Sequence, residues 1–209
     1  MQLTRLVVGF INTNCYILDD GENAVVIDPG AGADEILKTL ECKGVSLVYI
    51  FLTHAHFDHV LAVNELVKKT GAKVAVHKGE HYRLSDAEAS GHTILKTRKY
   101  EPIVADTEFE DGAYIDVGDM HFEFISTPGH TEGSVCIICG DMMFSGDTLF
   151  FDDCGRCDLM GGDYRAMLSS LRRLYELHGD YDVFPGHGEK TTLSRERANN
   201  RYMTEAMQS

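Results

Sequence analysis

The sequence lacks the features that would indicate a nucleic-acid or a membrane partner. It has 19 Lys and Arg residues against 33 Asp and Glu, a net charge of −14, and no basic run longer than two residues. Binding a polyanion needs clustered positive charge, so we expect no nucleic-acid partner. No stretch approaches the roughly 20 apolar residues that span a bilayer, so we expect no membrane partner either.

The sequence also shows neither a signal peptide for export nor a linker between domains. The first six residues enter a strand-like pattern at once, without the charged start and apolar stretch of a signal peptide. No repeat, low-complexity tract or Ser/Pro-rich linker interrupts the chain. We therefore expect one domain over residues 1–209 and a cytoplasmic location. The six cysteines agree with this location, because a chain of this size needs no disulfides to fold.

Hydrophobic periodicity predicts an alternation of strands and helices. Apolar or alternating runs indicate strands at about 2–8, 14–18, 24–28, 47–52, 73–77, 113–117, 120–126, 134–139, 141–145 and 181–184. Helical spacing indicates helices at about 33–42, 59–70, 163–178 and 194–207. Two strand-rich halves, each with helices, favour two mixed sheets packed face to face and covered outside by helices. The irregular residues 85–108 are either a substrate-facing flap or a surface connection.

A dense group of candidate metal ligands follows the apolar run at 47–52. His54, His56, Asp58 and His59 lie within six residues, and each can donate a lone pair to a transition metal. His54 and His56 are two apart, so at the end of an extended strand their side chains point the same way. Asp58 and His59 lie past a turn, where they do not easily reach the same ion. This stretch predicts two half-sites side by side.

Three more candidate ligands lie far along the chain, each in a turn after a predicted strand. His130 and His187 each follow a Pro-Gly pair, and Asp147 follows a glycine. Loops at strand ends are where sheets commonly place their chemistry. Seven ligands are too many for one ion and suit two. A set of nitrogen and oxygen donors without cysteine suits zinc, and also iron or manganese.

The order of these motifs resembles the metallo-β-lactamase-fold hydrolase superfamily. An H-x-H-x-D-H motif is followed by a Pro-Gly-His turn, a Gly-Asp turn and a second Pro-Gly-His turn, and the resemblance runs from about Asn12 to Arg197. The amino-acid sequences of segments 129–134 and 145–150, and the Gly155-Arg156 pair that follows the second segment, are most similar to the glyoxalase II-like branch, the hydroxyacylglutathione hydrolases. The resemblance implies an α+β fold, a four-layer αβ/βα sandwich.

The resemblance also implies a role for each ligand. A first metal ion would be held by His54, His56 and His130, and a second by Asp58, His59 and His187, with Asp147 bridging both. Asp28 would accept the other N–H of a ligand imidazole and so orient it. The expected cofactor is therefore a pair of divalent cations, zinc first.

Such a centre predicts hydrolysis of a small acyl thioester or ester. Two cations roughly 3.5–4 Å apart can share a water and lower its pKa to about 7, which makes a nucleophile at neutral pH. One metal would polarise the substrate carbonyl. Asp58 is the candidate catalytic carboxylate, because it can accept the proton of the water.

The substrate is less defined than the reaction. Full-length glyoxalase II enzymes carry a C-terminal helical domain that grips glutathione, whereas only a short tail follows His187. The resemblance is thus to shorter relatives, and the acyl group, thiol carrier and oligomeric state stay open. Arg156, Lys190 and Arg195 are either contacts for an anionic substrate or ordinary solvated residues.

Alternatives within and outside the superfamily remain. A persulfide dioxygenase with one iron needs only part of the ligand set, whereas a lactonase or another ester hydrolase would fit the whole of it. A β-lactamase is disfavoured, because Asp147 stands where that branch typically has a cysteine. A non-enzymatic zinc module would have a closed four-coordinate site, which seven ligands argue against.

Two Cys-x-x-Cys pairs suggest a competing zinc ribbon. Cys136 and Cys139 lie three apart in a predicted strand, so we expect them on opposite faces of a sheet, where they cannot share an ion. Cys154 and Cys157 lie in a glycine-bounded loop. We expect two thiols there, with a reversible disulfide as the alternative.

Overall fold

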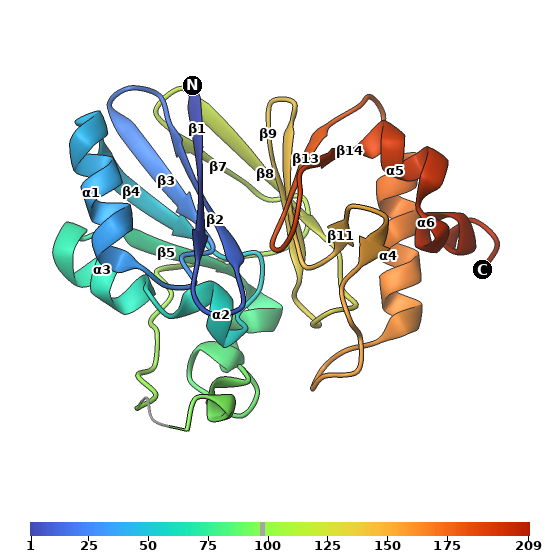
Figure 1. Cartoon of the computed structure of the whole chain (residues 1–209), viewed down its shortest axis with the longest axis horizontal. Coiled ribbons are helices and arrows are strands. Elements are labelled where there is room, and N and C mark those ends of the chain that lie inside the picture. The colour runs from blue at the N-terminus through green and yellow to red at the C-terminus, as the bar shows by residue number, and fades with distance from the viewer. Residues whose placement is uncertain (97–98) are drawn as a thin grey trace.

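The computed structural model, which describes residues 1–96 and 99–209, contains two six-stranded sheets packed face to face (Figure 1). The first sheet has the order β1-β2-β3-β4-β5-β6. Its strands are β1 (Gln2–Val8), β2 (Thr13–Asp19), β3 (Asn23–Ile27), β4 (Ser46–Phe51), β5 (Lys73–His77) and β6 (Thr107–Phe109). β1 to β3 pair antiparallel and β3 to β6 pair in parallel, so the sheet is mixed.

The second sheet has the order β14-β13-β10-β9-β8-β7. Its strands are β7 (Tyr114–Val117), β8 (Met120–Ser126), β9 (Val135–Cys139), β10 (Met142–Gly146), β13 (Asp182–Pro185) and β14 (Thr191–Thr192). β10 and β13 are parallel and the other pairs antiparallel. β11 (Leu149–Phe150) and β12 (Asp153–Cys154) form a separate small ladder. The predicted sandwich of two mixed sheets is confirmed.

Helices cover the outer faces of both sheets, as predicted (Figure 1). The first sheet carries α1 (Ala33–Lys43) and α3 (Val63–Thr70), and the second carries α4 (Tyr164–Glu176), α5 (Leu193–Asn199) and α6 (Arg201–Ala206). Three short helices, α2 (Phe57–Val60), η1 (Lys78–Leu84) and η2 (His92–Ile94), connect elements of the N-terminal half. In the described part of the chain, no helix combines the length and the apolar character needed to cross a membrane.

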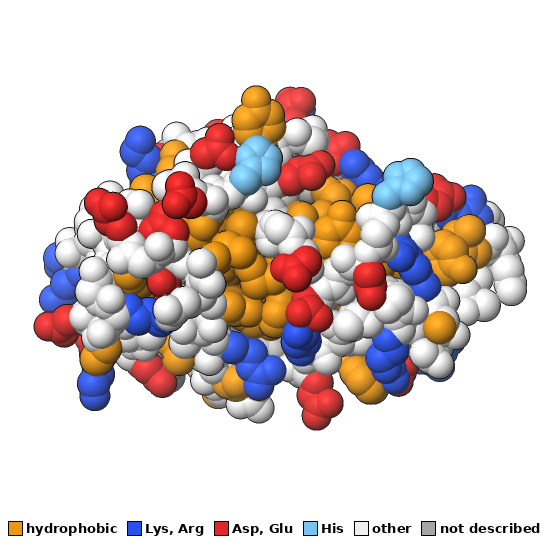
Figure 2. All heavy atoms as spheres, turned by 90° about the horizontal axis from the view of Figure 1, so that it is seen from above, with side chains coloured by type: hydrophobic (Ala, Val, Ile, Leu, Met, Phe, Trp, Pro, Cys, Tyr) orange, Lys and Arg blue, Asp and Glu red, His pale blue; other side chains and the backbone are white. Residues whose placement is uncertain are grey.

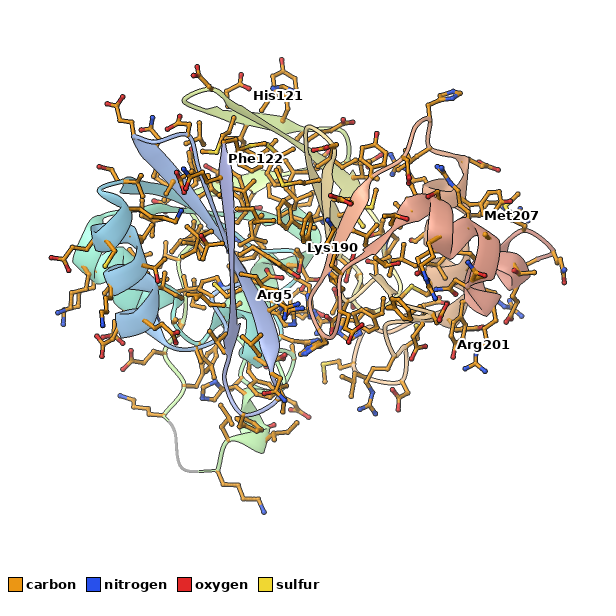
Figure 3. All side chains as sticks on the ribbon, turned by 45° about the horizontal axis from the view of Figure 1, so that its top comes forward. Arg5, His121, Phe122, Lys190, Arg201 and Met207 are labelled. Carbon is orange, nitrogen blue, oxygen red and sulfur yellow. The ribbon has the colours of Figure 1, made fainter. Side chains whose placement is uncertain are left out.

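The space between the sheets is filled by aromatic side chains. Phe51 meets Phe122 and Phe124 edge-on, with ring centroids 5.0 and 5.2 Å apart, and all three are fully buried (Figure 3). Cys139 packs in this inner layer whereas Cys136 packs against the outer helices, so the two thiols face opposite sides of the sheet as predicted. All six cysteines, Cys154 and Cys157 included, are free thiols.

Two predicted helices are each divided in the structure. The helix expected at 59–70 breaks because the N–H of Ala62 donates to the carbonyl of Pro29, at 2.9 Å, instead of continuing the helix. The helix expected at 194–207 breaks at Asn200, whose side chain caps α6 by accepting from the N–H groups of Tyr202 and Met203. The strands β6, β11, β12 and β14 have only two or three residues, too few for a periodic signal.

The two ends of the sandwich differ. The end that carries the N-terminus shows apolar side chains in its middle within a charged rim (Figure 2). At the other end, β4, β10 and β13 finish in turns that contain the predicted metal ligands. The fold therefore positions segments from both sheets at a single edge.

We predict that the aromatic layer is a main source of stability. Phe122→Ala should lower the free energy of unfolding by about 3–5 kcal/mol, because it leaves a cavity between the sheets. Tyr114→Ala, on neighbouring β7, removes a ring that is 66% exposed and should change stability by less than about 0.5 kcal/mol. Urea unfolding measures both values, and equal losses in the two variants would contradict this prediction.

Candidate metal centre

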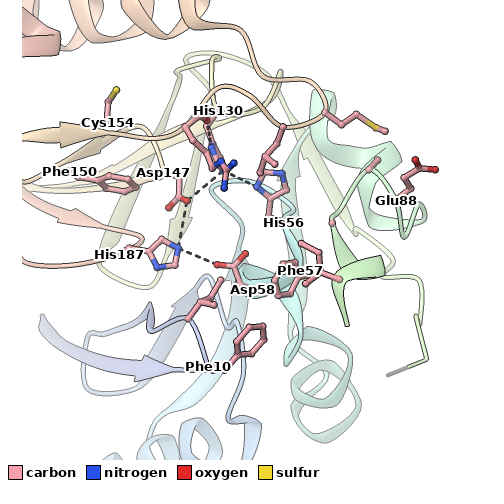
Figure 4. A pocket seen from close by; sticks show the side chains of 17 residues that line it. Phe10, His56, Phe57, Asp58, Glu88, His130, Asp147, Phe150, Cys154 and His187 are labelled. Carbon is pink, nitrogen blue, oxygen red and sulfur yellow. Dashed lines mark hydrogen bonds and ion pairs between the residues drawn. The ribbon is translucent and has the colours of Figure 1, made fainter. Parts of the chain in front are cut away.

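Four strand ends bring the seven predicted ligands together, and Figure 4 shows His56, Asp58, His130, Asp147 and His187 among them. β4 leads into the segment with His54 to His59, and β8 leads into the loop with His130. β10 and β13 are parallel neighbours, so Asp147 and His187, which follow them, lie side by side. Gly186 makes this approach possible, because a Cβ there would lie 2.3 Å from Oδ1 of Asp147.

One group of ligands consists of three histidines. His54, His56 and His130 are buried, and one ligand atom from each lies within 4.8 Å of the others. Nδ1 of His56 and Nε2 of His130 are 2.8 Å apart (Figure 4). Three imidazole nitrogens at this spacing can hold one metal ion.

A second group lies beside the first and contains a carboxylate. Asp58, His59 and His187 also bring ligand atoms within 4.8 Å of one another. Oδ2 of Asp58 is 3.3 Å from Nε2 of His59 and 3.2 Å from Nε2 of His187. This group can hold another ion.

Asp147 lies between the two groups. Its Oδ1 is 3.5 Å from Nε2 of His59, whereas its Oδ2 is 3.5 Å from Nε2 of His130 and 3.6 Å from Nε2 of His187 (Figure 4). The carboxylate therefore faces ligands of both groups. All seven residues predicted as ligands converge on one place.

Buried polar atoms that lack a hydrogen-bond partner indicate whether these residues suit metal ions. Nε2 of His54, Nε2 of His59 and Oδ1 of Asp147 are buried without a hydrogen-bond partner among the described residues. A buried polar atom left unpaired costs about 1–3 kcal/mol. A divalent cation accepts lone pairs from imidazole and carboxylate together, so the donor set fits metal binding.

The electrostatics of the group of three histidines keep two imidazoles unprotonated. Burial, followed by the neighbouring His59, holds the pKa of His54 well below its usual range. Burial and His130 lower the pKa of His56 to about 3. Both imidazoles therefore stay neutral and keep a lone pair for a metal.

The group that contains Asp58 behaves in the opposite way. Burial raises the pKa of Asp58, but the imidazoles of His59 and His187 outweigh it, so the pKa lies well below its usual range. Burial lowers the pKa of His59, but Asp58 and Asp147 raise it well above the usual value. Ionised carboxylates thus favour positive charge on or near His59, the charge that a metal ion would supply.

Asp28 supports the cluster from behind. Its Oδ2 accepts a hydrogen bond from Oγ1 of Thr53 at 2.6 Å and lies 2.9 Å from Nδ1 of His59. Its Oδ1 accepts from the N–H of Thr53 at 2.8 Å. Held in this way, His59 directs Nε2 toward the other ligands, the orientation expected from the sequence.

Two supporting contacts had no signal in the sequence. Glu80 is fully buried in η1, and its carboxylate accepts from the N–H groups of Ala55 and Gly133 at 2.8 and 3.0 Å. It thereby joins the two histidine-bearing loops. Nδ1 of His130 lies 2.7 Å from the carbonyl oxygen of Arg156. Only the folded chain reveals these contacts, because a lone Glu and a backbone carbonyl form no motif.

The residues predicted to contact an anionic substrate are separated in the structure. Arg156 lines a cavity beside the cluster. Lys190, on the β13–β14 connection, is paired with Asp182 at 2.6 Å (Figure 3), and Arg195, on α5, is paired with Asp152. Neither Lys190 nor Arg195 belongs to the cavity lining, because each turns toward its own acidic partner.

Part of the segment expected to be irregular faces the same cavity. Glu88, Ala89, Gly91 and Ile94 belong to its lining, which favours the flap interpretation over a simple surface connection. Residues 97–98 of this segment lie outside the described residues.

Comparison with known proteins agrees with this geometry. Residues 8–187 match the model of the Metallo-beta-lactamase superfamily. Probable metallo-hydrolase YqgX of Bacillus subtilis is 34% identical over 97% of this chain and 98% of its own. Hydroxyacylglutathione hydrolase GloC of Haemophilus influenzae is 29% identical with the same coverage.

Two solved structures resemble the whole chain. BLEG-1, a B3 metallo-beta-lactamase, superposes with a TM-score of 0.89 at 34% identity, over 97% of this chain and 100% of its own. TTHA1623 in a di-iron-bound form superposes with a TM-score of 0.85 at 33% identity, over 95% of this chain and 99% of its own.

We predict that Asp28 tunes metal affinity through His59. Asp28→Asn should weaken metal binding by about 10–100-fold, because an amide is a poorer acceptor for the imidazole N–H. Competition with a chromogenic chelator measures the affinity. Asp106→Asn is the matched control, since that carboxylate also accepts a backbone N–H, from Val74, but far from the cluster. Unchanged affinity in Asp28→Asn would refute the role.

Proposed function

The chain belongs to the metallo-beta-lactamase superfamily, and we propose that it hydrolyses a small acyl thioester at a dinuclear metal centre. The observation that supports this proposal is the position of Asp147 between two ligand groups, with unpartnered buried atoms in both. A single structural zinc would need only four ligands in a closed site.

In this proposal each ligand group holds one ion. The first ion would be held by His54, His56 and His130 and the second by Asp58, His59 and His187, and the Asp147 carboxylate could serve both. Zinc suits the nitrogen and oxygen donors, and so do iron and manganese. The di-iron form of the similar protein TTHA1623 supports iron as the alternative.

The chain positions the groups that such a centre needs. When bound, a pair of divalent cations supplies an activated water and polarises a carbonyl oxygen. Asp58 lines the cavity and stays ionised, so its carboxylate can accept a hydrogen bond from a water molecule there. Thr13 donates to Oδ2 of Asp58 at 3.0 Å and fixes its orientation.

The likeness to GloC supports a thioester as the substrate. The likeness to BLEG-1 makes β-lactam hydrolysis the second candidate. A lactonase activity and a one-iron persulfide dioxygenase are the further alternatives within the superfamily.

One experiment separates these functions. The protein is purified without added metal, its metal content is measured, and it is assayed with S-D-lactoylglutathione, nitrocefin, an acyl-homoserine lactone and glutathione persulfide with oxygen uptake. We expect two metal equivalents per chain and thioester turnover. One iron with oxygen uptake, or turnover of the lactam or lactone alone, would refute the thioesterase proposal.

We predict that removing Asp147 affects both ions. Asp147→Ala should lower metal content and reduce kcat/KM by more than about 100-fold, beyond the usual loss from an outer-shell partner. Elemental analysis and turnover are measured on the same preparation. Asp141→Ala, at the exposed β9–β10 turn, should change neither. Full metal content with normal turnover in Asp147→Ala would rule out the bridging role.

A further inference from the structure

A cavity of about 580 Å³ opens beside the ligand cluster, and most of its lining is apolar (Figure 4). Asp58, Asp147 and His187 form its floor. This size suits a small ligand, and a mainly apolar wall with a few polar groups is typical of ligand sites. The apolar and charged side chains of the walls therefore influence which substrate can reach Asp58, Asp147 and His187.

One wall comes from the β1–β2 turn and from η2. Phe10 is 65% exposed and lies stacked against Phe57, with ring centroids 6.1 Å apart. Ile94, at the end of η2, is 64% exposed. A single exposed apolar side chain is ordinary, but several gathered at one cavity mark a binding surface.

Leu159 and Met160 also line the cavity, and buried Arg83 joins their loop to the segment before η2. The guanidinium of Arg83 donates to the carbonyl oxygen of Ala89 on one side and to that of Met160, at 2.8 Å, on the other. Its side chain is fully buried. Arg83 thus holds the backbones of Ala89 and Met160, two lining residues from distant segments, close together.

The charges in the cavity disfavour an anionic substrate. Among the described residues of the lining, Arg156 is the single Lys or Arg, and Asp158 already binds it through two contacts of 2.7 and 2.8 Å. Apart from Asp58 and Asp147, whose charges the proposed cations would offset, Glu88 adds a carboxylate to the lining. Glutathione carries two carboxylates, and outside the metal centre the described lining offers them no unpaired Lys or Arg.

We propose that the cavity selects thioesters by an uncharged, apolar acyl group of aromatic or branched aliphatic size, and that it gives no advantage to a glutathione carrier. This inference rests on the proposed thioesterase function. Contact with the apolar walls would be made by the acyl side chain while the carbonyl faces the ligand cluster.

The test is a panel of four thioesters, in which acetyl and phenylacetyl groups are each joined to N-acetylcysteamine and to glutathione. We expect kcat/KM to be at least about tenfold higher for phenylacetyl than for acetyl with either thiol, a discrimination typical of apolar pockets. Changing the thiol should alter kcat/KM by less than about threefold. An acyl ratio near one, or a tenfold advantage for glutathione, would overturn the inference and leave the thioesterase function standing.

Variants assign the preference to the walls. Phe10→Ser and Ile94→Ser should each lower the phenylacetyl-to-acetyl ratio by at least about fivefold, and the ratio is independent of metal loading. Val104→Ser is the matched control, because Val104 is 78% exposed and lies outside the lining. A ratio that is unchanged in both wall variants would overturn the assignment.

A binding measurement supplies a readout that needs no turnover. Calorimetry on the metal-free protein compares the 2-phenylethyl and ethyl thioethers of N-acetylcysteamine, and we expect the phenylethyl compound to bind at least about tenfold more tightly. Equal binding would overturn the inference. Absence of hydrolysis of every thioester in the panel would instead refute the thioesterase function and, with it, the substrate class.

Discussion

The rest of the structure depends on three buried polar atoms that have no hydrogen-bond partner among the described residues. Folding removes three atoms from water without giving them a hydrogen bond to any described residue: Nε2 of His54, Nε2 of His59 and Oδ1 of Asp147. Such atoms, crowded beside ionised carboxylates, are costly unless a cation joins them. The sandwich brings them together because strands of both sheets end at one edge, and no single helix or sheet presents seven donors to one point.

Convergence of the strand ends alone would not set the distances between the ligand side chains. Close backbone approaches at two glycines set them. A Cβ at Gly30 would lie 1.6 Å from the carbonyl oxygen of Asp58, and one at Gly186 would lie 2.8 Å from Cε1 of His59. The chain segments therefore touch where side chains would separate them. Behind them, the carboxylates of Asp28 and Glu80 bind backbone N–H groups of the ligand loops, so the ligands are held before any ion arrives.

The sequence predicted the sandwich and singled out the seven residues that converge at its edge, because both leave local marks. Apolar periodicity marks strands and helices, and glycine-framed turns after strands mark ligands such as His130. It did not predict contacts that arise only between distant segments. The bond from Ala62 to Pro29 breaks a helix whose pattern is continuous, and buried Arg83 looks like any charged residue of a polar stretch. Lys190 and Arg195 looked available for a substrate because their acidic partners are set by folding.

The ligands and the cavity walls come largely from different segments, and this separation has a consequence for function. Phe10, Ile94 and Met160 lie on the β1–β2 turn, on η2 and in the loop before α4, which carry none of the seven ligands. Substitution there would change the cavity lining without removing a candidate ligand. Proteins named as a hydroxyacylglutathione hydrolase and as a β-lactamase can therefore share this fold at 29% and 34% identity with the chain. An apolar, cation-poor wall is then a property of this chain, to be interpreted from its own residues rather than from the fold.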